Sequence, residues 1–420
     1  MYQNEDGTMR ETAILAAVDT GEYDIEISLQ ELRELADTAE IDTLGVVVQK
    51  RSTPDPATAM GIGRLGELAE LVRQTEAEMI IFDMELSPAQ LRNIEKECDC
   101  PVIDRTMLIL NIFARHAVTG EGKLQVELAQ LRYQLPRLAG KGVQLSRQGG
   151  GGAGGGGARR GAGESQLETD KRHLRARIDT LSEQLAEVAT RRNMLRSRRK
   201  KDRVTTVAIV GYTNVGKSTL LNTLTEAGVL TEDKLFATLD PTSRALTLPD
   251  GRQVMLIDTV GLVRRLPHHL VEAFKSTLEE ASNADLILNV CDITSNEMQE
   301  QLTVTLDLLR SLEAEAIPVV TVLNKCDRMT GIETPLGLNA VLISAKTGEG
   351  LDRLLLAVQK ALPDSHRRVK LLIPYSAGEL ESRLSAGGKV FSREYVAEGV
   401  ELDINLDSTL LYLAEKYIVG

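Results

Sequence analysis

The chain lacks any apolar segment long enough to cross a membrane. No apolar run approaches the ~20 residues that a spanning helix requires. The N-terminal residues Met1–Thr8 contain no basic stretch followed by an apolar core, so we expect no signal peptide. Metal-binding cysteine spacing is also absent, because Cys98 and Cys100 are separated by one residue, and the other cysteines are the isolated Cys291 and Cys326. These absences predict a cytoplasmic protein with ordinary thiols.

The charge of the chain is unevenly distributed. At 420 residues the chain is too long for one hydrophobic core, and we expect two to four domains. Its net charge of −12 argues against nonspecific nucleic-acid binding by the whole surface. Residues 158–203, however, hold 14 Lys and Arg against 7 Asp and Glu, a net +7 that leaves −19 elsewhere. This segment is either a contact for RNA phosphates or a solvated helix face, and both readings remain open.

Residues Gly211–Ser218 read G-Y-T-N-V-G-K-S, a complete phosphate-binding loop. The β-branched run Val204–Val210 before it predicts a buried strand, and Ser218–Thr225 after it predicts the start of a helix. In this order, backbone N–H groups surround a β-phosphate and the helix N-terminus favours its negative charge. We expect Lys217 to bridge the β- and γ-phosphates and the Ser218 hydroxyl to hold Mg²⁺.

A second motif is suited to the γ-phosphate and the metal. Asp258-Thr259-Val260-Gly261 follows the apolar run Val254–Ile257. An aspartate at the end of a strand can hold Mg²⁺ through water, and the Gly261 N–H can reach the γ-phosphate. The spacing therefore predicts a D-x-x-G segment that responds to the terminal phosphate.

Two further motifs are suited to a guanine base. Asn324-Lys325-Cys326-Asp327 follows Val319–Leu323, and Ser344-Ala345-Lys346 follows Ala340–Ile343. Asp327 can accept hydrogen bonds from both N1–H and the N2 amino group of guanine. Adenine offers neither donor, so a buried aspartate at this position rejects ATP by leaving a charge unpaired. We expect the Ser344–Lys346 segment to close over the base.

All four motifs follow predicted strands in one chain order. An open parallel sheet binds its ligands at the carboxyl ends of the strands, so the four segments are expected to meet at one edge. The set predicts a GTP-hydrolysing enzyme built on a doubly wound α/β sheet, with residues 204–364 as its GTPase domain.

The first 120 residues alternate strand-like and helix-like segments, which predicts a small parallel α/β domain. Predicted strands are Thr12–Val18, Thr43–Gln49, Met79–Asp83 and Pro101–Asp104, and predicted helices are Leu29–Glu40, Leu65–Glu76 and Pro88–Cys98. Gly61–Gly66 matches the dinucleotide-binding pattern G-x-G-x-x-G. That fingerprint must follow a strand directly, whereas residues 51–60 contain two prolines and read as a surface loop. We therefore reject a dinucleotide site here.

Residues 121–203 predict an antiparallel helical hairpin. Apolar residues recur at spacings of four and three in two stretches, Leu124, Leu128, Leu131, Leu135 and Leu138, then Leu174, Ile178, Leu181, Leu185 and Val188. Pro136 is expected to kink or end the first helix. Between the stretches, Gly149–Gly157 is all glycine except Ala153, and Arg159 and Arg160 follow. This segment is either a flexible linker or a tip whose backbone and arginines approach RNA phosphates.

Residues 365–420 predict a small α+β domain with no catalytic constellation. Strand-like runs at Val369–Ile373, Val390–Tyr395 and Val400–Ile404 alternate with helix-like runs at Ala377–Ala386 and Thr409–Tyr417. The predicted chain is thus a multi-domain α/β protein, with domains at residues 1–120, 121–203, 204–364 and 365–420.

The motifs and the segments around them resemble the HflX family of translation-associated GTPases. The matching segments are Glu121–Leu131, Arg160–Asp170, Gly211–Leu220, Leu235–Thr242 and Asp258–Leu278. The resemblance covers nearly the whole chain in the family's domain order. Two positions depart from it: Ala162 stands where R-G-P-G-E usually has proline, and Leu262 stands where phenylalanine is more usual.

The resemblance extends the predicted nucleotide site. Thr238 and Thr242 are both plausible Mg²⁺ ligands by spacing, and the resemblance implies that Thr238 joins Ser218 and Asp258 on the metal. The residues expected to bind the nucleotide are Gly211, Tyr212, Thr213, Asn214, Val215, Gly216, Lys217, Ser218, Thr219, Phe236, Ala237, Thr238, Leu239, Asp240, Asp258, Thr259, Val260, Gly261, Asn324, Lys325, Cys326, Asp327, Ser344, Ala345 and Lys346. Those expected to act in hydrolysis are Lys217, Asn214, Thr238 and Gly261.

The predicted hydrolytic machinery lacks one common part. Many GTPases place a glutamine after D-x-x-G to orient the attacking water. This chain has Leu262 there, which cannot form a hydrogen bond, so we expect a low intrinsic rate. Resemblance to GTPases with asparagine at the same place in the phosphate loop implies that Asn214 ligates K⁺ beside the β–γ bridge.

The resemblance also implies a partner. It predicts a monomeric GTPase that docks on the large (50S) ribosomal subunit through the N-terminal domain and the hairpin, and that splits or rescues ribosomes under stress. Expected RNA phosphate contacts are Arg159, Arg160, Arg191, Arg192, Arg196, Arg198 and Arg199. Two alternatives remain open: a GTPase that assembles the large subunit, and a GTP-regulated scaffold for a protein partner.

Overall fold

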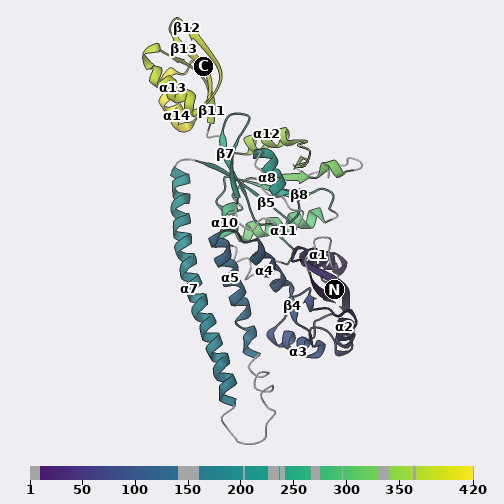
Figure 1. The fold of residues 1–420 in the computed structure, drawn as a ribbon. Helices are drawn as coiled ribbons and strands as arrows, with labels where there is room; N and C mark the ends of the chain where they lie inside the picture. The colour runs from purple at the N-terminus through teal and green to yellow at the C-terminus, as the bar shows by residue number, and fades with distance from the viewer. Residues whose placement is uncertain are drawn as a thin grey trace, which may run out of the picture. The chain divides into compact units, whose positions relative to one another are not determined.

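The chain folds into two compact units, each built from α/β elements (Figure 1). The computed structural model describes residues 10–140, 160–201, 204–225, 236, 242–265, 275–295, 297–329, 340–362 and 366–419. The first unit comprises Met1–Met194, Glu232–Asp240 and Arg265–Lys275, and the second comprises Leu195–Thr231, Pro241–Arg264 and Ser276–Gly420. The multi-domain α/β class expected from the sequence is confirmed.

The first unit contains a parallel four-stranded sheet in the order β2-β1-β3-β4. Its strands are β1 (Glu11–Asp19), β2 (Ile41–Lys50), β3 (Met79–Phe82) and β4 (Val102–Asp104). Its helices are α1 (Ile25–Thr38), α2 (Ile62–Thr75), α3 (Pro88–Cys98) and α4 (Arg105–His116). Helix α4 was not predicted, because its nearly continuous apolar run has no helical period to distinguish it.

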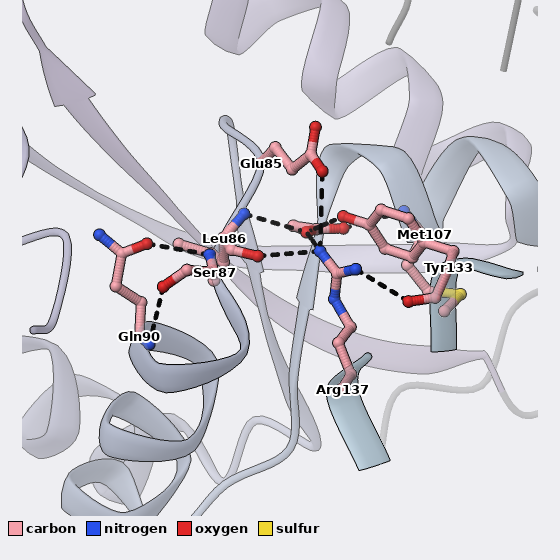
Figure 2. A network of polar contacts seen from close by, with 8 residues as sticks. Glu85, Leu86, Ser87, Gln90, Met107, Tyr133 and Arg137 are labelled. Carbon is pink, nitrogen blue, oxygen red and sulfur yellow. Dashed lines mark hydrogen bonds and ion pairs between the residues drawn. The ribbon is translucent and has the colours of Figure 1, made fainter. Parts of the chain in front are cut away.

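Short-range signals explain where these helices begin. The Asp24 carboxylate accepts the first N–H groups of α1, and Ser87 and Gln90 form a capping box at α3 (Figure 2). Gly61 is the N-cap of α2, so the first glycine of G-x-G-x-x-G starts an ordinary helix. The expectation of an exposed loop over residues 51–60 is wrong at its end, where Ala59 and Met60 are buried.

A buried carboxylate lies at the carboxyl end of β4. Asp104 accepts hydrogen bonds from the N–H groups of Leu86 at 3.1 Å and Met107 at 3.0 Å. It also accepts from the Tyr133 hydroxyl and from Arg137 at 3.2 Å. The Arg137 guanidinium lies 3.4 Å from the centre of the Tyr133 ring (Figure 2). Four donors thus satisfy one buried charge and join the sheet to the helical region.

The helical region consists of α5 (Gly120–Gln134), the 3₁₀ turn η1 (Arg137–Gly140) and α7 (Arg160–Lys201), and α5 and α7 lie side by side (Figure 1). Arg177 pairs with Glu127 at 2.7 Å and Arg192 with Glu121 at 2.6 Å, so the partners follow one another in opposite order along the two helices, as in an antiparallel pair. Helix α5 also packs on α4 and buries a second face there, so it is more than one apolar stripe. The glycine-rich segment Gly149–Gly157 lies outside the described residues.

The second unit contains a six-stranded sheet in the order β10-β9-β8-β5-β7-β6. Its strands are β5 (Thr205–Gly211), β6 (Thr242–Thr247), β7 (Gln253–Asp258), β8 (Leu286–Asp292), β9 (Val319–Asn324) and β10 (Ala340–Leu342). Its helices are α8 (Lys217–Thr225), α10 (Lys275–Ser282), α11 (Met298–Ser311), the 3₁₀ turn η2 (Cys326–Arg328) and α12 (Leu351–Ala361). Strand β6 is antiparallel to β7, whereas the other neighbouring strands of this sheet pair in parallel, so the sheet is mixed.

The second unit also contains a three-stranded antiparallel sheet in the order β11-β13-β12. Its elements are β11 (His366–Ile373), η3 (Tyr375–Ala377), α13 (Gly378–Gly387), β12 (Lys389–Val396), β13 (Gly399–Asp407), α14 (Ser408–Ala414) and η4 (Glu415–Tyr417). The buried apolar residues of β13 recur at every second position, Val400, Leu402, Ile404 and Leu406, which is the period-two pattern of a strand that packs one face on a core. Among all the helices described, none has the length and apolar character needed to span a membrane.

Candidate nucleotide-binding site

The phosphate loop connects β5 to α8, as the motif predicted. Lys217 is buried, and its Nζ donates a hydrogen bond to the Tyr212 carbonyl at 2.7 Å. Burial lowers the pKa of the Lys217 ammonium to about 8, because desolvation disfavours its charge. Gly216 has φ +93°, and a Cβ there would overlap the side-chain amide of Asn324. The loop conformation therefore requires glycine at this position.

Two of the three expected metal ligands, Ser218 and Asp258, lie together, and the third, Thr238, lies outside the described residues. The Ser218 hydroxyl donates to the Asp258 carboxylate at 2.7 Å. Strand β5 pairs with β7 with Ile209 opposite Asp258, which brings the two motifs to one edge. Thr242, the alternative metal ligand, pairs with Asp258 across the β6–β7 ladder. Hydroxyl and carboxylate oxygens are the ligands that Mg²⁺ prefers, so these residues fit the metal.

The D-x-x-G motif closes onto the phosphate loop. Leu262 N–H donates to the Gly211 carbonyl at 3.1 Å, and Thr213 N–H donates to the Leu262 carbonyl at 2.8 Å. A Cβ at Gly261 would lie 2.6 Å from Thr213 Cγ2 and 3.1 Å from Lys217 Nζ, so only glycine fits this approach. The Leu262 side chain is buried and apolar. It offers no polar group to a water at this position.

Asn324 joins the phosphate loop to the base-binding motifs. Its side chain is buried, its Nδ2 donates to the Val215 carbonyl at 2.7 Å, and its Oδ1 accepts from Ala345 N–H at 2.8 Å. One amide thus holds three motifs that are far apart in the sequence. This arrangement fits the expectation that the strand ends meet at one edge of the sheet.

Asp327 lies on the 3₁₀ turn η2 and accepts a hydrogen bond from the Ser344 hydroxyl at 2.6 Å. That bond holds the pKa of the Asp327 carboxyl below its usual range, so it is ionised at neutral pH. The expectation of a buried aspartate is wrong, because Asp327 is exposed at the rim of the strand ends. Exclusion of water from this carboxylate therefore depends on the base itself.

The other predicted residues have varied surroundings. Thr259 is buried and donates to the Ile209 carbonyl at 2.7 Å, whereas Lys346 is exposed. Phe236 belongs to the first unit, where its ring packs edge-on against Phe113 at 4.6 Å between centroids. Ala237, Thr238, Leu239 and Asp240 lie outside the described residues.

Sequence reasoning missed one member of this edge. Asp292 ends β8 and pairs with Lys325 Nζ at 2.8 Å, while the same Nζ donates to the Asn214 carbonyl at 2.8 Å. This places Lys325 between the phosphate loop and the end of β8. An aspartate ending an apolar run, L-I-L-N-V-C-D, was the available signal.

Comparison with known proteins covers most of the chain. Residues 26–114, 116–199 and 206–325 match the family models described as "GTP-binding GTPase N-terminal", "GTP-binding GTPase Middle Region" and "50S ribosome-binding GTPase". A GTPase HflX of Caldanaerobacter subterraneus subsp. tengcongensis is 46% identical over 412 residues, 98% of this chain and 94% of the relative. The chain belongs to the HflX family of GTPases. It is therefore a GTP-binding hydrolase.

A second curated relative agrees with this assignment. The GTPase HflX of Escherichia coli strain K12 is 44% identical over 370 residues, 87% of this chain and 85% of the relative. A solved structure described as "crystal structure of SsGBP and GDP complex" is 26% identical with a TM-score of 0.47, covering 84% of this chain and all of that one. Membership in the family rests on the sequence relatives.

Proposed function

We propose that this GTPase binds the large ribosomal subunit in its GTP form, splits or rescues ribosomes in the cytoplasm, and leaves after hydrolysis. The match of residues 206–325 to the model named "50S ribosome-binding GTPase" carries the proposal. The γ-phosphate is expected to order the segments around Thr238 and Gly261, and its loss releases them. Ser218 and Asp258 are the described residues proposed to hold Mg²⁺, which supplies positive charge to the β- and γ-phosphate oxygens when bound.

Helix α7 and the tip beside it are proposed to contact ribosomal RNA. Arg191 is exposed on α7, as a phosphate contact must be. Arg192 is withdrawn from the proposed contacts, because its guanidinium is ion-paired with Glu121 within the hairpin. The remaining proposed arginines have side chains outside the described residues: Arg159, Arg160, Arg196, Arg198 and Arg199.

Sedimentation tests the proposed partner. The protein is loaded with a non-hydrolysable GTP analogue, mixed with ribosomal particles and centrifuged through sucrose. Co-migration with mature large subunits and loss of intact ribosomes support the proposal. Co-migration with precursor particles alone favours the assembly role, and migration with neither favours a scaffold for a protein partner.

A charge reversal on α7 tests the proposed surface. Arg191→Glu should weaken binding to the large subunit and lower the dependence of the affinity on salt by about one counterion in slope. Arg310→Glu is the matched control, because Arg310 is also an exposed helical arginine and lies in α11. Equal affinities for the two variants contradict a role for α7.

The catalytic proposal concerns a low intrinsic rate that K⁺ raises. Leu262 cannot orient water, so positive charge must come from elsewhere. Asn214 is exposed in the phosphate loop with φ +58°, and its side chain is available to a cation. Turnover measured in KCl and NaCl at equal ionic strength should be faster in KCl, and Asn214→Ala should abolish the difference. Equal rates of the unmodified protein in the two salts exclude the K⁺ site.

A further inference from the structure

Two short pieces of the GTPase sequence belong to the first unit. They are Glu232–Asp240, in which Phe236 is described, and Arg265–Lys275, in which the side chain of Arg265 is described. Both pieces lie in segments that a γ-phosphate is expected to order. The contacts that hold them therefore bear on the GTPase cycle.

Arg265 is bound by a buried acid of the first unit. Its guanidinium donates to the Asp83 carboxylate at 2.8 Å and to the Ser28 hydroxyl. The guanidinium also lies 4.0 Å from the centre of the Tyr23 ring, which adds a cation–π contact. The side chain of Asp83 is 1% exposed and that of Arg265 is 34% exposed. The arginine thus reaches from the surface to a carboxylate that water does not reach.

Arg265 is one of two guanidinium partners of the buried Asp83 carboxylate. Asp83 also accepts from Arg105 at 2.9 Å, and Arg105 pairs with Glu31. We call Ser28, Glu31, Asp83 and Arg105 the Asp83 cluster. Arg265 brings a second positive charge to the Asp83 carboxylate, and its loss would remove one of that carboxylate's two ion pairs. Because an uncompensated buried charge is costly, the cluster retains Arg265 strongly.

Phe236 is held by the same helix that supplies Arg105. Its ring is 2% exposed and meets Phe113 at 4.6 Å with an interplanar angle of 74°. Arg105 begins α4, and Phe113 lies two turns further along it. Helix α4 therefore packs directly on Phe236, and it contacts Asp83, the partner of Arg265, through Arg105.

Contacts on both Leu262 and Arg264 restrict the movement of the chain between the nucleotide site and Arg265. Leu262 is hydrogen-bonded to the phosphate loop, and Arg264 pairs with Glu297 at 2.5 Å and with Glu300 at 3.0 Å. Arg265 itself has φ +48°, a strained conformation for a residue with a side chain. A shift at Gly261 must therefore be passed on to Arg265 or be absorbed by breaking these contacts.

The γ-phosphate requires such a shift. The Gly261 N–H and the Lys217 ammonium are both expected to bind the γ-phosphate. Gly261 already lies beside that ammonium, since a Cβ on it would be 3.1 Å from Lys217 Nζ, and a γ-phosphate is expected to draw the Gly261 N–H toward the nucleotide. GDP, which ends at the β-phosphate, makes no such demand.

We propose that Asp83 is a positioning residue for the GTPase cycle. It holds Arg265, and through Arg265 the D-x-x-G segment, in the arrangement that suits GDP. Binding of the γ-phosphate then withdraws Arg265 from the Asp83 cluster. The first unit then differs between the GTP and GDP forms at Ser28, Asp83 and Tyr23. The contact of Phe236 with Phe113 is a second point at which a nucleotide-responsive segment is bound to the first unit.

Fluorescence can report the release of Arg265 directly. The chain contains no tryptophan, so Tyr23→Trp places a single fluorophore beside the guanidinium and keeps the cation–π contact. The nucleotide-free and GDP forms should give the same emission, and a non-hydrolysable GTP analogue should change it. In the double variant with Arg265→Ala this response should be absent. Identical emission with GDP and the analogue overturns the proposal, as does a response that survives in the double variant.

Nucleotide affinities provide a second test. Arg265→Ala should raise the affinity for the GTP analogue relative to GDP by about 5- to 150-fold, the range of an ordinary coupling between two sites. Ser28→Ala should give a smaller shift, and the two substitutions together should add little to Arg265→Ala alone, because both act through Asp83. Arg115→Ala, which removes an exposed arginine–glutamate pair of the same unit, is the control and should leave the ratio unchanged. A ratio that Arg265→Ala leaves unchanged refutes the coupling.

Discussion

Replacing Asn324 with alanine should uncouple the phosphate loop from the base-binding motifs. The substitution removes two buried hydrogen bonds, one to the Val215 carbonyl at 2.7 Å and one from Ala345 N–H at 2.8 Å. A buried polar group left without a partner costs roughly 1–3 kcal/mol, so the two groups together lose roughly 2–6 kcal/mol. This loss is shared between the stability of the second unit and the order of its nucleotide site.

Part of that free-energy loss should appear as a measurable decrease in nucleotide affinity. If about 1.4–2.8 kcal/mol appears in binding, the dissociation constant for GDP rises about 10- to 100-fold. Titration of the variant with GDP by calorimetry measures this directly. Asn324→Asp should bind no better than Asn324→Ala, because a carboxylate keeps the acceptor for Ala345 N–H but points negative charge at the Val215 carbonyl.

Asn289→Ala is the control that separates the loss of stability from the loss of nucleotide affinity. Asn289 is fully buried on β8, and its Nδ2 has no hydrogen-bond partner within the part of the chain that the structure describes. Its removal tests the loss of a buried asparagine that joins no motifs. A coupling role for Asn324 is refuted if Asn324→Ala is destabilised like Asn289→Ala and yet binds GDP within about threefold of the unmodified protein, a difference of under 1 kcal/mol.

Three further outcomes are expected. Asp327→Asn should exchange guanine for xanthine nucleotides, because its amide can donate to the xanthine 2-carbonyl; retained preference for GDP in competition binding contradicts this role. Tyr133→Phe should destabilise the first unit by about 1.5–3 kcal/mol, the worth of a hydrogen bond to a charged group, and thermal unfolding with GDP binding as the control measures it. Because burial raises the pKa of the Tyr133 phenol, it is a donor across pH 6–9 and the loss should be constant there. In native protein at pH 8 a thiol reagent should modify only the partly exposed Cys326, because burial raises the pKa of the Cys98 and Cys291 thiols to about 12. Bound GDP should slow the modification of Cys326. Labelling of the buried thiols contradicts the packing.

Much of the nucleotide site follows from the sequence because its chemistry depends on neighbours along the chain. A phosphate loop needs glycine where the backbone bends, a lysine and a hydroxyl at fixed spacing, and a strand and a helix around them, and Thr205–Thr225 contains all of these. The alternation of strands and helices predicted the parallel sheet of the first unit in the same way. Helix α4 escaped prediction, since an apolar run without a period fits either a buried strand or a buried helix.

The family and the four motifs were thus determined by the sequence alone, because each motif is a local pattern with a local physical cause. Only the tertiary structure decided which distant groups meet. In the folded chain Asp292 pairs with Lys325, Arg192 pairs with Glu121 inside the hairpin, and Arg265 pairs with Asp83, while Asp327 is exposed. These pairings join residues up to 182 positions apart. No spacing along the chain specifies them, since they depend on how buried charges and apolar faces find partners once the whole chain is packed.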